Sequence, residues 1–305
     1  MAVLGFDIGG TSVKYGVVEE SGAFLQRGKF ATPQRDIRAL VHELRQVKVE
    51  MAGKYSLQGA GMSFPGAVDE EKGSIGGASS VPCIHGFAIR ELLERELQLP
   101  VAMENDANCA ALGELWLGAA QGKKDVVFVV CGSGIGGAVI KSRQIHKGAH
   151  LHGGEFGYMV LDDSGQILSE AASPVAMARR VAAALGVSAA EMTGEKAFQL
   201  AAKGNFQAQC EIDRMYRQLA RAVYNIQYMY DPEVIVIGGA ISVREDMIAR
   251  LDHEVDEILT QVKIARIRPQ ICCCRFGNDA NLLGAVYHFL QAGTACTKYL
   301  GELLV

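Results

Sequence analysis

Short apolar runs alternate along the chain with longer stretches in which apolar residues recur at helical spacing. Val3–Phe6 and Val126–Val130 are compact apolar runs of the kind that form buried strands. After Asp36, apolar residues recur three, four and one positions apart, which predicts an amphipathic helix. This alternation indicates a layered α/β protein. The other predicted strands are 23–31, 59–64, 101–103, 234–237 and 269–276, and the other predicted helices are 87–97, 107–117, 174–186, 189–203, 207–230, 245–261 and 280–291.

The opening pattern of strand, glycine-rich turn and strand occurs twice. Strand 3–6 returns as strand 13–18 after a glycine turn, and strand 126–130 returns as strand 138–140 in the same way. Two halves that open alike indicate an internal duplication, with a boundary near 118–124. We therefore expect a first domain over residues 1–118 and a second over 119–291, and the C-terminal helix near 292–305 is a candidate to complete the first domain.

Composition fits two globular domains and excludes several classes of partner. The 305 residues are 49% hydrophobic and 21% charged, enough to fill two cores. A net charge of −4 gives no electrostatic reason to expect nucleic acid or an anionic membrane. No apolar run approaches the roughly 20 residues that span a bilayer, and the N-terminal run lacks the basic flank of a signal peptide. We expect a cytoplasmic protein.

The eight cysteines are scattered, and no CxxC pair occurs among them. Several lie inside apolar runs, so free thiols packed as small core residues in a reducing compartment explain them best. Cys272 and Cys274 form a C-x-C fragment. Outside the run 272–274, no histidine or further cysteine lies nearby in the sequence. Core packing is therefore favoured over a metal site there.

The first glycine turn, Asp7–Thr11, lies between two predicted strands. Its glycines allow backbone N–H groups to approach a phosphate, and Thr11 and Lys14 can add a hydroxyl and a charge. Asp7, at the strand end, is placed to hold Mg²⁺ or one of its waters. A plain tight hairpin explains this segment equally well, and no Walker A pattern is present.

Two further glycine turns follow buried strands. Gly132–Gly137 is not a dinucleotide-binding GxGxxG motif, because a β-branched strand rather than a helix follows it. Gly238 and Gly239 follow the strand 234–237, where an adenosine could rest. Each turn alone is weak evidence, but three of them after buried strands indicate a site for a nucleotide polyphosphate.

Acidic residues provide the candidates for catalysis. Asp106, between a short strand and an alanine-rich helix, could act as a general base or could simply cap that helix, and both roles remain open. Glu155 and Glu170 flank a glycine-rich stretch with little predicted structure, where isolated glutamates are usually solvated. The loop histidines 146, 150 and 152 do not have metal-binding spacing.

Together these segments resemble the ROK family of sugar kinases over nearly the whole chain. The most specific match is Glu104–Glu114, which is similar to the family's catalytic segment. Leu4–Lys14 and Gly132–Gly137 are similar to its two phosphate motifs, and Gly154–Tyr158 stands where the family has Gly-Glu-x-Gly-His. The resemblance implies the actin-like, ribonuclease-H-like ATPase fold, with two α/β domains and an interdomain cleft.

The resemblance also implies roles for individual residues, with ATP and Mg²⁺ as cofactors. Asp106 would be the general base on the sugar hydroxyl, and Asn105, Glu155 and Glu170 would bind sugar hydroxyls. In-line phosphoryl transfer needs this combination of base, metal and positioning groups. The implied phosphate and Mg²⁺ contacts are Asp7, Gly9, Gly10, Thr11, Lys14, Gly132, Ser133 and Gly134, and those near the adenosine are Gly238, Gly239 and Asn281.

The chain departs from the family pattern at its zinc site. Most members hold a structural zinc through that motif's histidine and three downstream cysteines. Here Tyr158 replaces the histidine, and 159–170 contains no cysteine, so we expect no zinc. A zinc-free branch that includes β-glucoside kinases is most similar, and 78–85 resembles its sugar-side loop. Tyr158 could offer a sugar an aromatic face or merely fill the space left by zinc.

The expected activity is ATP-dependent phosphorylation of a sugar 6-hydroxyl, in a β-glucoside such as cellobiose or in glucose itself. N-acetylmannosamine kinase and fructokinase are the alternatives within the class. A sugar-sensing ROK regulator is the alternative from another class, although the first strand at residue 2 or 3 leaves no room for a helix-turn-helix before it. An actin-like ATPase without sugar chemistry is disfavoured by Asn105–Asp106. Sugar and ATP are the expected partners, in a homodimer.

Overall fold

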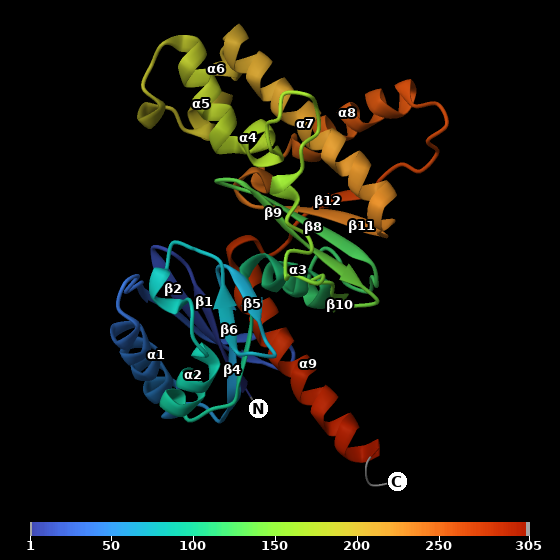
Figure 1. The fold of residues 1–305 in the computed structure, drawn as a ribbon. Helices are drawn as coiled ribbons and strands as arrows, with labels where there is room; N and C mark the ends of the chain where they lie inside the picture. The colour runs from blue at the N-terminus through green and yellow to red at the C-terminus, as the bar shows by residue number, and fades with distance from the viewer. Residues whose placement is uncertain (1, 303–305) are drawn as a thin grey trace. The chain divides into compact units, whose positions relative to one another are not determined.

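The computed structural model describes the backbone of residues 2–302 and the side chains of residues 2–293. The chain divides into two compact units (Figure 1). The first contains 1–121, 148–152 and 278–305, and the second contains 122–147 and 153–277. Its first boundary lies three residues beyond the predicted domain boundary.

The first unit is built on a mixed five-stranded sheet of order β3-β2-β1-β4-β7. The strand β1 runs antiparallel to β2 and parallel to β4, which in turn runs parallel to β7. Apolar side chains on one face of β1 pack against helices α1 and α2 in a single core cluster. The bounds are β1 (Ala2–Ile8), β2 (Ser12–Glu19), β3 (Phe24–Ala31), α1 (Ile37–Ala52), β4 (Leu57–Phe64), β5 (Ala67–Asp69), β6 (Ser74–Gly76), α2 (Ile89–Leu97), β7 (Val101–Asn105) and α3 (Asp106–Leu117).

The helix α9 (Ala280–Glu302) covers the opposite face of this sheet. Glycines permit the close approach: a Cβ on Gly5 would lie 3.0 Å from the Val286 side chain, and one on Gly61 would overlap the backbone of Ala285. Residues 278–291 therefore belong with the first unit, which corrects their predicted place in the second domain. Their apolar face fits the glycine-rich side of this sheet, a match that sequence periodicity alone does not reveal. Of the cysteines, the side chain of Cys296 lies outside the described residues.

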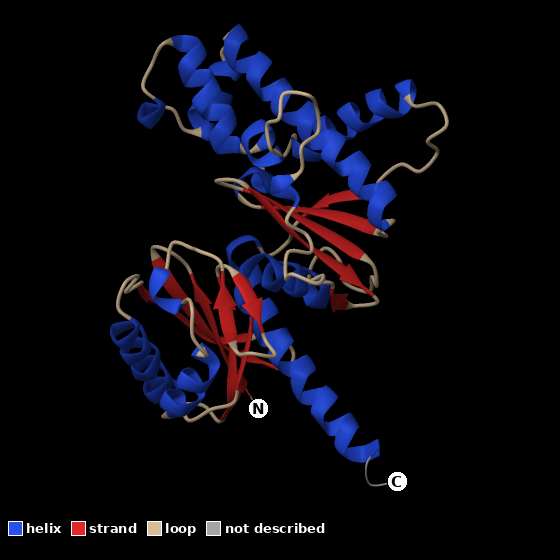
Figure 2. Ribbon diagram, viewed as in Figure 1, coloured by secondary structure: helices blue, strands red, loops and turns tan. Residues whose placement is uncertain are grey.

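The second unit repeats this topology with a sheet of order β10-β9-β8-β11-β12. Here β8 runs antiparallel to β9 and parallel to β11, as β1 does to β2 and β4. The helices gather over one face of the sheet (Figure 2), and their apolar sides share a core with β8 and β11. The bounds are β8 (Val126–Cys131), β9 (Ile135–Lys141), β10 (Gln144–Ile145), α4 (Leu168–Ala172), α5 (Pro174–Leu185), α6 (Gly194–Ala202), α7 (Phe206–Tyr230), β11 (Val234–Gly238), α8 (Met247–Gln261) and β12 (Ile271–Cys273).

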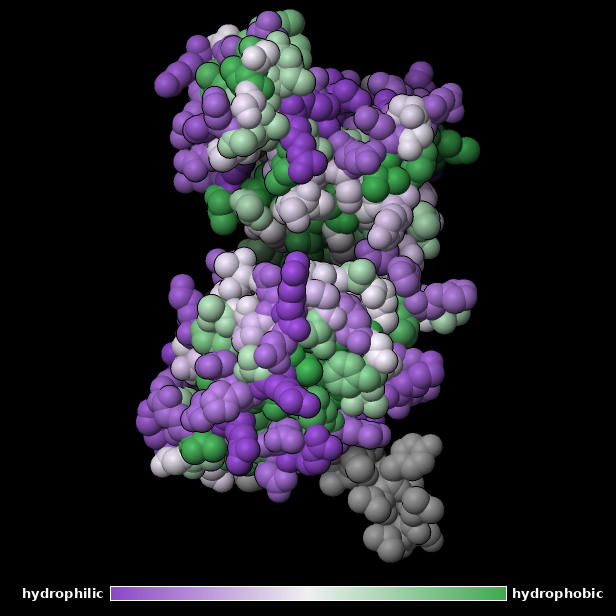
Figure 3. Space-filling model, turned by 60° about the vertical axis from the view of Figure 1, so that its left-hand side comes forward, coloured by the Kyte–Doolittle hydropathy of each residue, from purple (hydrophilic) through white to green (hydrophobic). Residues whose placement is uncertain are grey.

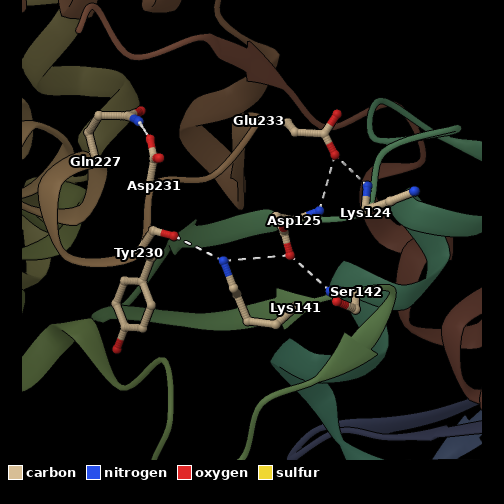
Figure 4. A network of polar contacts seen from close by, with 8 residues as sticks. All are labelled: Lys124, Asp125, Lys141, Ser142, Gln227, Tyr230, Asp231 and Glu233. Atoms are coloured by element: carbon tan, nitrogen blue, oxygen red, sulfur yellow. Dashed lines mark hydrogen bonds and ion pairs between the residues drawn. The ribbon is translucent and has the colours of Figure 1, made fainter.

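A polar network closes the end of β8 that lies away from its glycine turn (Figure 4). The Glu233 carboxylate accepts hydrogen bonds from the backbone N–H groups of Lys124 (2.6 Å) and Asp125 (3.2 Å), and these bonds lower the pKa of Glu233. The Asp125 carboxylate accepts a bond from the N–H of Ser142 and lies 3.6 Å from the Lys141 ammonium. The network fixes β8 relative to β9 and β11 from the end opposite the candidate phosphate turn.

Several segments differ from the predicted elements. The helix expected over 189–203 is a 3-10 helix over Ala189–Glu191 followed by α6, and the short strands β5, β6 and β10 were not predicted. The strand expected over 269–276 is only Ile271–Cys273, because Pro269 supplies no N–H to the sheet. The short helix α4 occupies part of the stretch for which little structure was expected.

The surface is mostly polar, with hydrophobic residues scattered over the visible face (Figure 3). Among the described residues, no helix is both long enough and apolar enough to cross a membrane.

Candidate active site

The first glycine turn is organised around Asp7, which lies buried in β1. One oxygen of Asp7, Oδ1, accepts hydrogen bonds from Ser63 Oγ at 2.9 Å and Asn281 Nδ2 at 3.2 Å. The other, Oδ2, lies 3.7 Å from Lys14 Nζ. Because both oxygens are oriented by fixed partners, Asp7 is a preorganised hard-oxygen donor of the kind Mg²⁺ prefers.

The turn itself is braced by side chains from neighbouring loops. Thr32 Oγ1 donates to the carbonyl of Gly9 at 2.6 Å, and Gln34 Nε2 donates to the carbonyl of Gly10. Ser80 packs directly on Gly10 and would overlap any Cβ there. Thr11 is exposed at the tip. The turn is therefore a rigid element with its outer face accessible, as phosphate binding by backbone N–H groups requires.

At the N-terminus of α3, the hydrogen bonds show which of Asn105 and Asp106 is the N-cap residue. Asn105 Oδ1 accepts from the N–H groups of Ala107 (2.9 Å) and Asn108 (3.2 Å), so Asn105 is the N-cap and Asp106 is the first helical residue. Asp106 is therefore not the N-cap residue, although its Oδ1 also accepts a hydrogen bond from the N–H of Ala107 at 2.8 Å. Asn105 Nδ2 also donates to the carbonyl of Gly66 at 3.0 Å, which leaves its second N–H for a ligand.

Several carboxylates lie around this helix start. Burial raises the pKa of the Cys109 thiol well above its usual range, and the negative charges of Glu104, Asp7 and Asp106 raise it further. Glu104, Asp7 and Asp106 therefore each lie near enough to Cys109 to act on its thiol. Of the described residues, one group of three has ligand atoms all within 4.8 Å that could hold a metal: Glu70, Glu104 and His288. In this group His288 Nε2 lies 2.9 Å from Glu70 Oε1.

The second unit brings its two glycine turns together. Gly239 has φ +85°, and a Cβ there would overlap the backbone of Cys131, the last residue of β8. In contrast, a Cβ on Gly132 would meet no described atom within 4 Å. Packing among the described residues therefore does not require a glycine at Gly132, and space beside its backbone is open. Gly134 accepts at its carbonyl from the N–H of Gly132, which closes the turn, and Ser133 is exposed.

The predicted sugar ligands of this unit lie on adjacent segments. Glu155 precedes the 3-10 helix Phe156–Tyr158, and Glu170 lies in α4. These segments are joined by the bond from the N–H of Leu168 to the carbonyl of Met159 (2.7 Å). All three candidate side chains are exposed, and Tyr158 is 67% exposed, so it does not fill an internal space. Its predicted role as a void filler is therefore wrong.

Comparison with known proteins agrees with this arrangement. The ROK family model matches residues 3–292. The chain belongs to the ROK family. A β-glucoside kinase of Listeria monocytogenes is 34% identical over 95% of this chain and 98% of its own length. A ROK protein of Streptococcus pneumoniae, solved in complex with sucrose, is 38% identical with TM-score 0.88, covering 97% of this chain and all of that one. A ROK glucokinase of Streptomyces griseus, solved with glucose and AMPPNP, is 25% identical with TM-score 0.75, covering 94% of this chain and 98% of that one.

These relatives confirm the predicted family, its β-glucoside kinase branch and the actin-like ATPase fold. The predicted site residues are divided between the two structural units. The first unit holds Asp7, Gly9, Gly10, Thr11, Lys14, Asn105, Asp106 and Asn281, and the second holds Gly132, Ser133, Gly134, Glu155, Tyr158, Glu170, Gly238 and Gly239.

Two residues that support this site, Ser63 and Ser169, were not predicted from the sequence. Ser63 on β4 bonds to Asp7, and so does the amide of Asn281, which is predicted to lie near the adenosine. Ser63 could have been noticed in the sequence, because it lies between Met62 and Phe64 in an apolar run and a buried hydroxyl needs a hydrogen-bond partner. Ser169, which bonds to Ile135 of the second turn, had no comparable signal.

Proposed function

We propose that this ROK-type sugar kinase transfers the γ-phosphoryl group of ATP to the 6-hydroxyl of a β-glucoside such as cellobiose. The predicted enzyme class, an ATP-dependent carbohydrate kinase, is confirmed by its relatives. The observation that supports the residue-level proposal is the start of α3: Asn105 is the N-cap, so Asp106 is not needed at that position, although its Oδ1 also accepts from the N–H of Ala107.

Asp106 acts as the general base. Its carboxylate accepts the proton of the sugar 6-hydroxyl as that oxygen forms a bond to the γ-phosphorus, while the bond from the γ-phosphorus to the β–γ bridging oxygen breaks and ADP leaves. Asn105 offers its remaining N–H to the acceptor. Glu155 and Glu170 accept hydrogen bonds from its other hydroxyls.

The glycine turns bind the polyphosphate. Backbone N–H groups around Gly9–Thr11 and Gly132–Gly134 donate to phosphate oxygens, and Lys14 adds positive charge. Asp7 fits a Mg²⁺ site, because its buried carboxylate is held by Ser63 and Asn281 with its Oδ2 directed toward Lys14. Bound Mg²⁺ would neutralise charge on the phosphates. Gly238 and Gly239 remain the proposed adenosine contacts.

Two observations favour a β-glucoside as the acceptor. The β-glucoside kinase of Listeria monocytogenes matches over nearly its whole length. In addition, Tyr158 presents an exposed aromatic ring beside Glu155, and apolar sugar faces pack well on such rings. Glucose is the second candidate, because the Streptomyces griseus relative was solved with it. The homodimer stays a prediction.

The test compares kcat/KM for cellobiose and glucose in a coupled ADP-release assay, because specificity is the ratio of these values. We expect cellobiose to equal or exceed glucose, and Tyr158→Ala to reduce kcat/KM for cellobiose more than for glucose. Asp106→Asn, which keeps the shape of the side chain, should lower kcat by roughly 10²–10⁴ with both sugars. A preference for glucose above about tenfold, or ~1.4 kcal/mol, would replace the β-glucoside by glucose. Near-normal turnover by a folded Asp106→Asn variant would contradict its role as the base.

A further inference from the structure

A single hydroxyl joins the second glycine turn to the segment that carries Glu170. Ser169 Oγ accepts a hydrogen bond from the backbone N–H of Ile135 at 2.9 Å and donates to the carbonyl of the same residue at 3.2 Å. Ile135 follows Gly134 and begins β9, and Ser169 immediately precedes Glu170 in α4. Both backbone groups of Ile135 are thus bound by one side chain that is 34 residues away in sequence.

The packing around this hydroxyl leaves little freedom to either segment. A Cβ on Gly134 would lie 3.2 Å from Ser169 Oγ, and one on Gly157 would overlap both that oxygen and the carbonyl of Ile135. Gly157 belongs to the 3-10 helix that follows Glu155. The phosphate turn, the Glu155 segment and α4 therefore meet at Ser169. Contact with Ser169 and Ile135 requires the glycine at Gly157 and leaves little room for a side chain at Gly134.

Arg180 on α5 holds the other side of α4. Its guanidinium donates to the carbonyls of Glu170 at 2.6 Å and Ala171 at 3.1 Å. The same guanidinium is fixed by Glu211 of α7, whose carboxylate lies 2.6 Å from Arg180 Nε. Because the backbone of Glu170 lies between Ser169 and Arg180, the position of its carboxylate depends on the phosphate turn on one side and on the helical layer on the other.

We propose that Ser169 is a positioning residue that couples nucleotide binding to acceptor binding, with Arg180 as the fixed support behind it. A polyphosphate that orders the turn Gly132–Gly134 would, through Ile135 and Ser169, hold α4 in the position in which Glu170 binds the sugar. The inference rests on the proposed roles of this turn and of Glu170. Linkage requires the coupling to be reciprocal, so the sugar must tighten nucleotide binding by the same factor.

The coupling factor is measured by calorimetry of the full chain. Cellobiose affinity is measured with and without saturating Mg²⁺-AMPPNP, and AMPPNP affinity with and without cellobiose. We expect the wild-type factor to lie in the range of roughly 5–150-fold that is typical of coupled sites. In Ser169→Ala it should fall below about twofold in both directions, and acceptor KM should rise more than kcat falls. Arg180→Met should weaken cellobiose binding in both nucleotide states.

The controls are matched by residue type and place. Ser164→Ala removes an exposed hydroxyl from the same loop, and Arg179→Met removes the exposed neighbour of Arg180. Both should keep the wild-type factor. If Ser169→Ala does not fold, as judged by its melting curve, Ser169→Cys replaces the hydroxyl by a weakly bonding thiol of similar shape.

The possible results distinguish a failure of the coupling through Ser169 from a failure of the sugar-binding role of Glu170. A folded Ser169→Ala or Ser169→Cys with the wild-type coupling factor overturns the proposal, as does a wild-type factor near one. Glu170→Gln tests the underlying assignment: if it binds cellobiose as tightly as the wild type, the sugar-binding role of Glu170 fails. Weakened binding in Glu170→Gln together with unchanged coupling in Ser169→Ala refutes only the coupling.

Discussion

Replacing Gly284 by alanine tests how closely α9 packs against α3, the helix that begins at Asp106. A Cβ at Gly284 would lie 2.9 Å from the Cα of Cys109 and would overlap the carbonyl oxygen of the same residue. Carbon–oxygen contacts are normally about 3.3 Å or longer, and the carbonyl oxygen of Cys109 is the nearest atom, so α3 and α9 would have to separate by roughly 1.5 Å. The cost falls on backbone atoms, which cannot avoid the methyl group by changing rotamer.

We expect the free energy of unfolding to fall by about 3 kcal/mol, in the upper part of the range for overpacked cores. This is the net loss, because alanine also gains at most ~1 kcal/mol over glycine in helix propensity. For a unit of this size that corresponds to roughly 6–12 °C in Tm, measured by circular dichroism. Gly293→Ala in the same helix is the control, because a Cβ there meets no described atom within 4 Å. It should leave Tm unchanged or raise it. A Gly284→Ala protein that melts within about 1 °C of the wild type would refute the close packing of α3 on α9.

Two further predictions concern charge at the site. Asp7→Ala should abolish turnover and weaken binding of Mg²⁺-ATP more than binding of metal-free ATP; equal losses would make Asp7 structural rather than metal-directed. Burial raises the pKa of Cys109 and raises that of Cys131 to about 12, so above the unfolded thiol pKa of about 8.5 the unfolded chain releases protons that the folded chain retains. The contribution of each buried thiol to the free energy of unfolding is therefore complete below that pH and declines above it, by about 1.4 kcal/mol per pH unit per thiol. Between pH 8 and pH 10 the urea midpoint should fall less in Cys131→Ala than in the wild type.

The parts of the fold that follow from sequence are those with local causes. Strands β1, β8 and β11 are apolar runs that end in glycines, and those turns occupy the positions expected from the pattern. Asp106 could be identified as a candidate but not assigned, because Asn105 and Asp106 are both good capping residues. The hydrogen bonds of Asn105 decide between them, and they depend on the exact start of the helix.

The parts that sequence did not predict depend on contacts between distant segments. The helix α9 has an apolar face that either domain could have buried, and the glycines Gly5, Gly59 and Gly61 mark the sheet that receives it. Ser169 and Arg180 are ordinary residues of a short helix and its neighbour. Their importance comes from partners 34 and 10 residues away, and neither spacing forms a recognisable motif.

The electrostatics of the first unit explain why such a site would depend on a metal. The charges of Glu104, Asp7 and Asp106 all raise the pKa of Cys109, so all three carboxylates act on this one thiol, and Lys14 is the cation that lies close to Asp7. ATP is itself a polyanion, and like charges at short range in a partly buried site repel strongly. Lys14 is about one-third exposed, so solvent weakens its compensation. A divalent cation on Asp7 would supply the missing positive charge beside the phosphates. Metal-free ATP should accordingly bind the wild-type protein weakly, and more tightly as salt screens the repulsion.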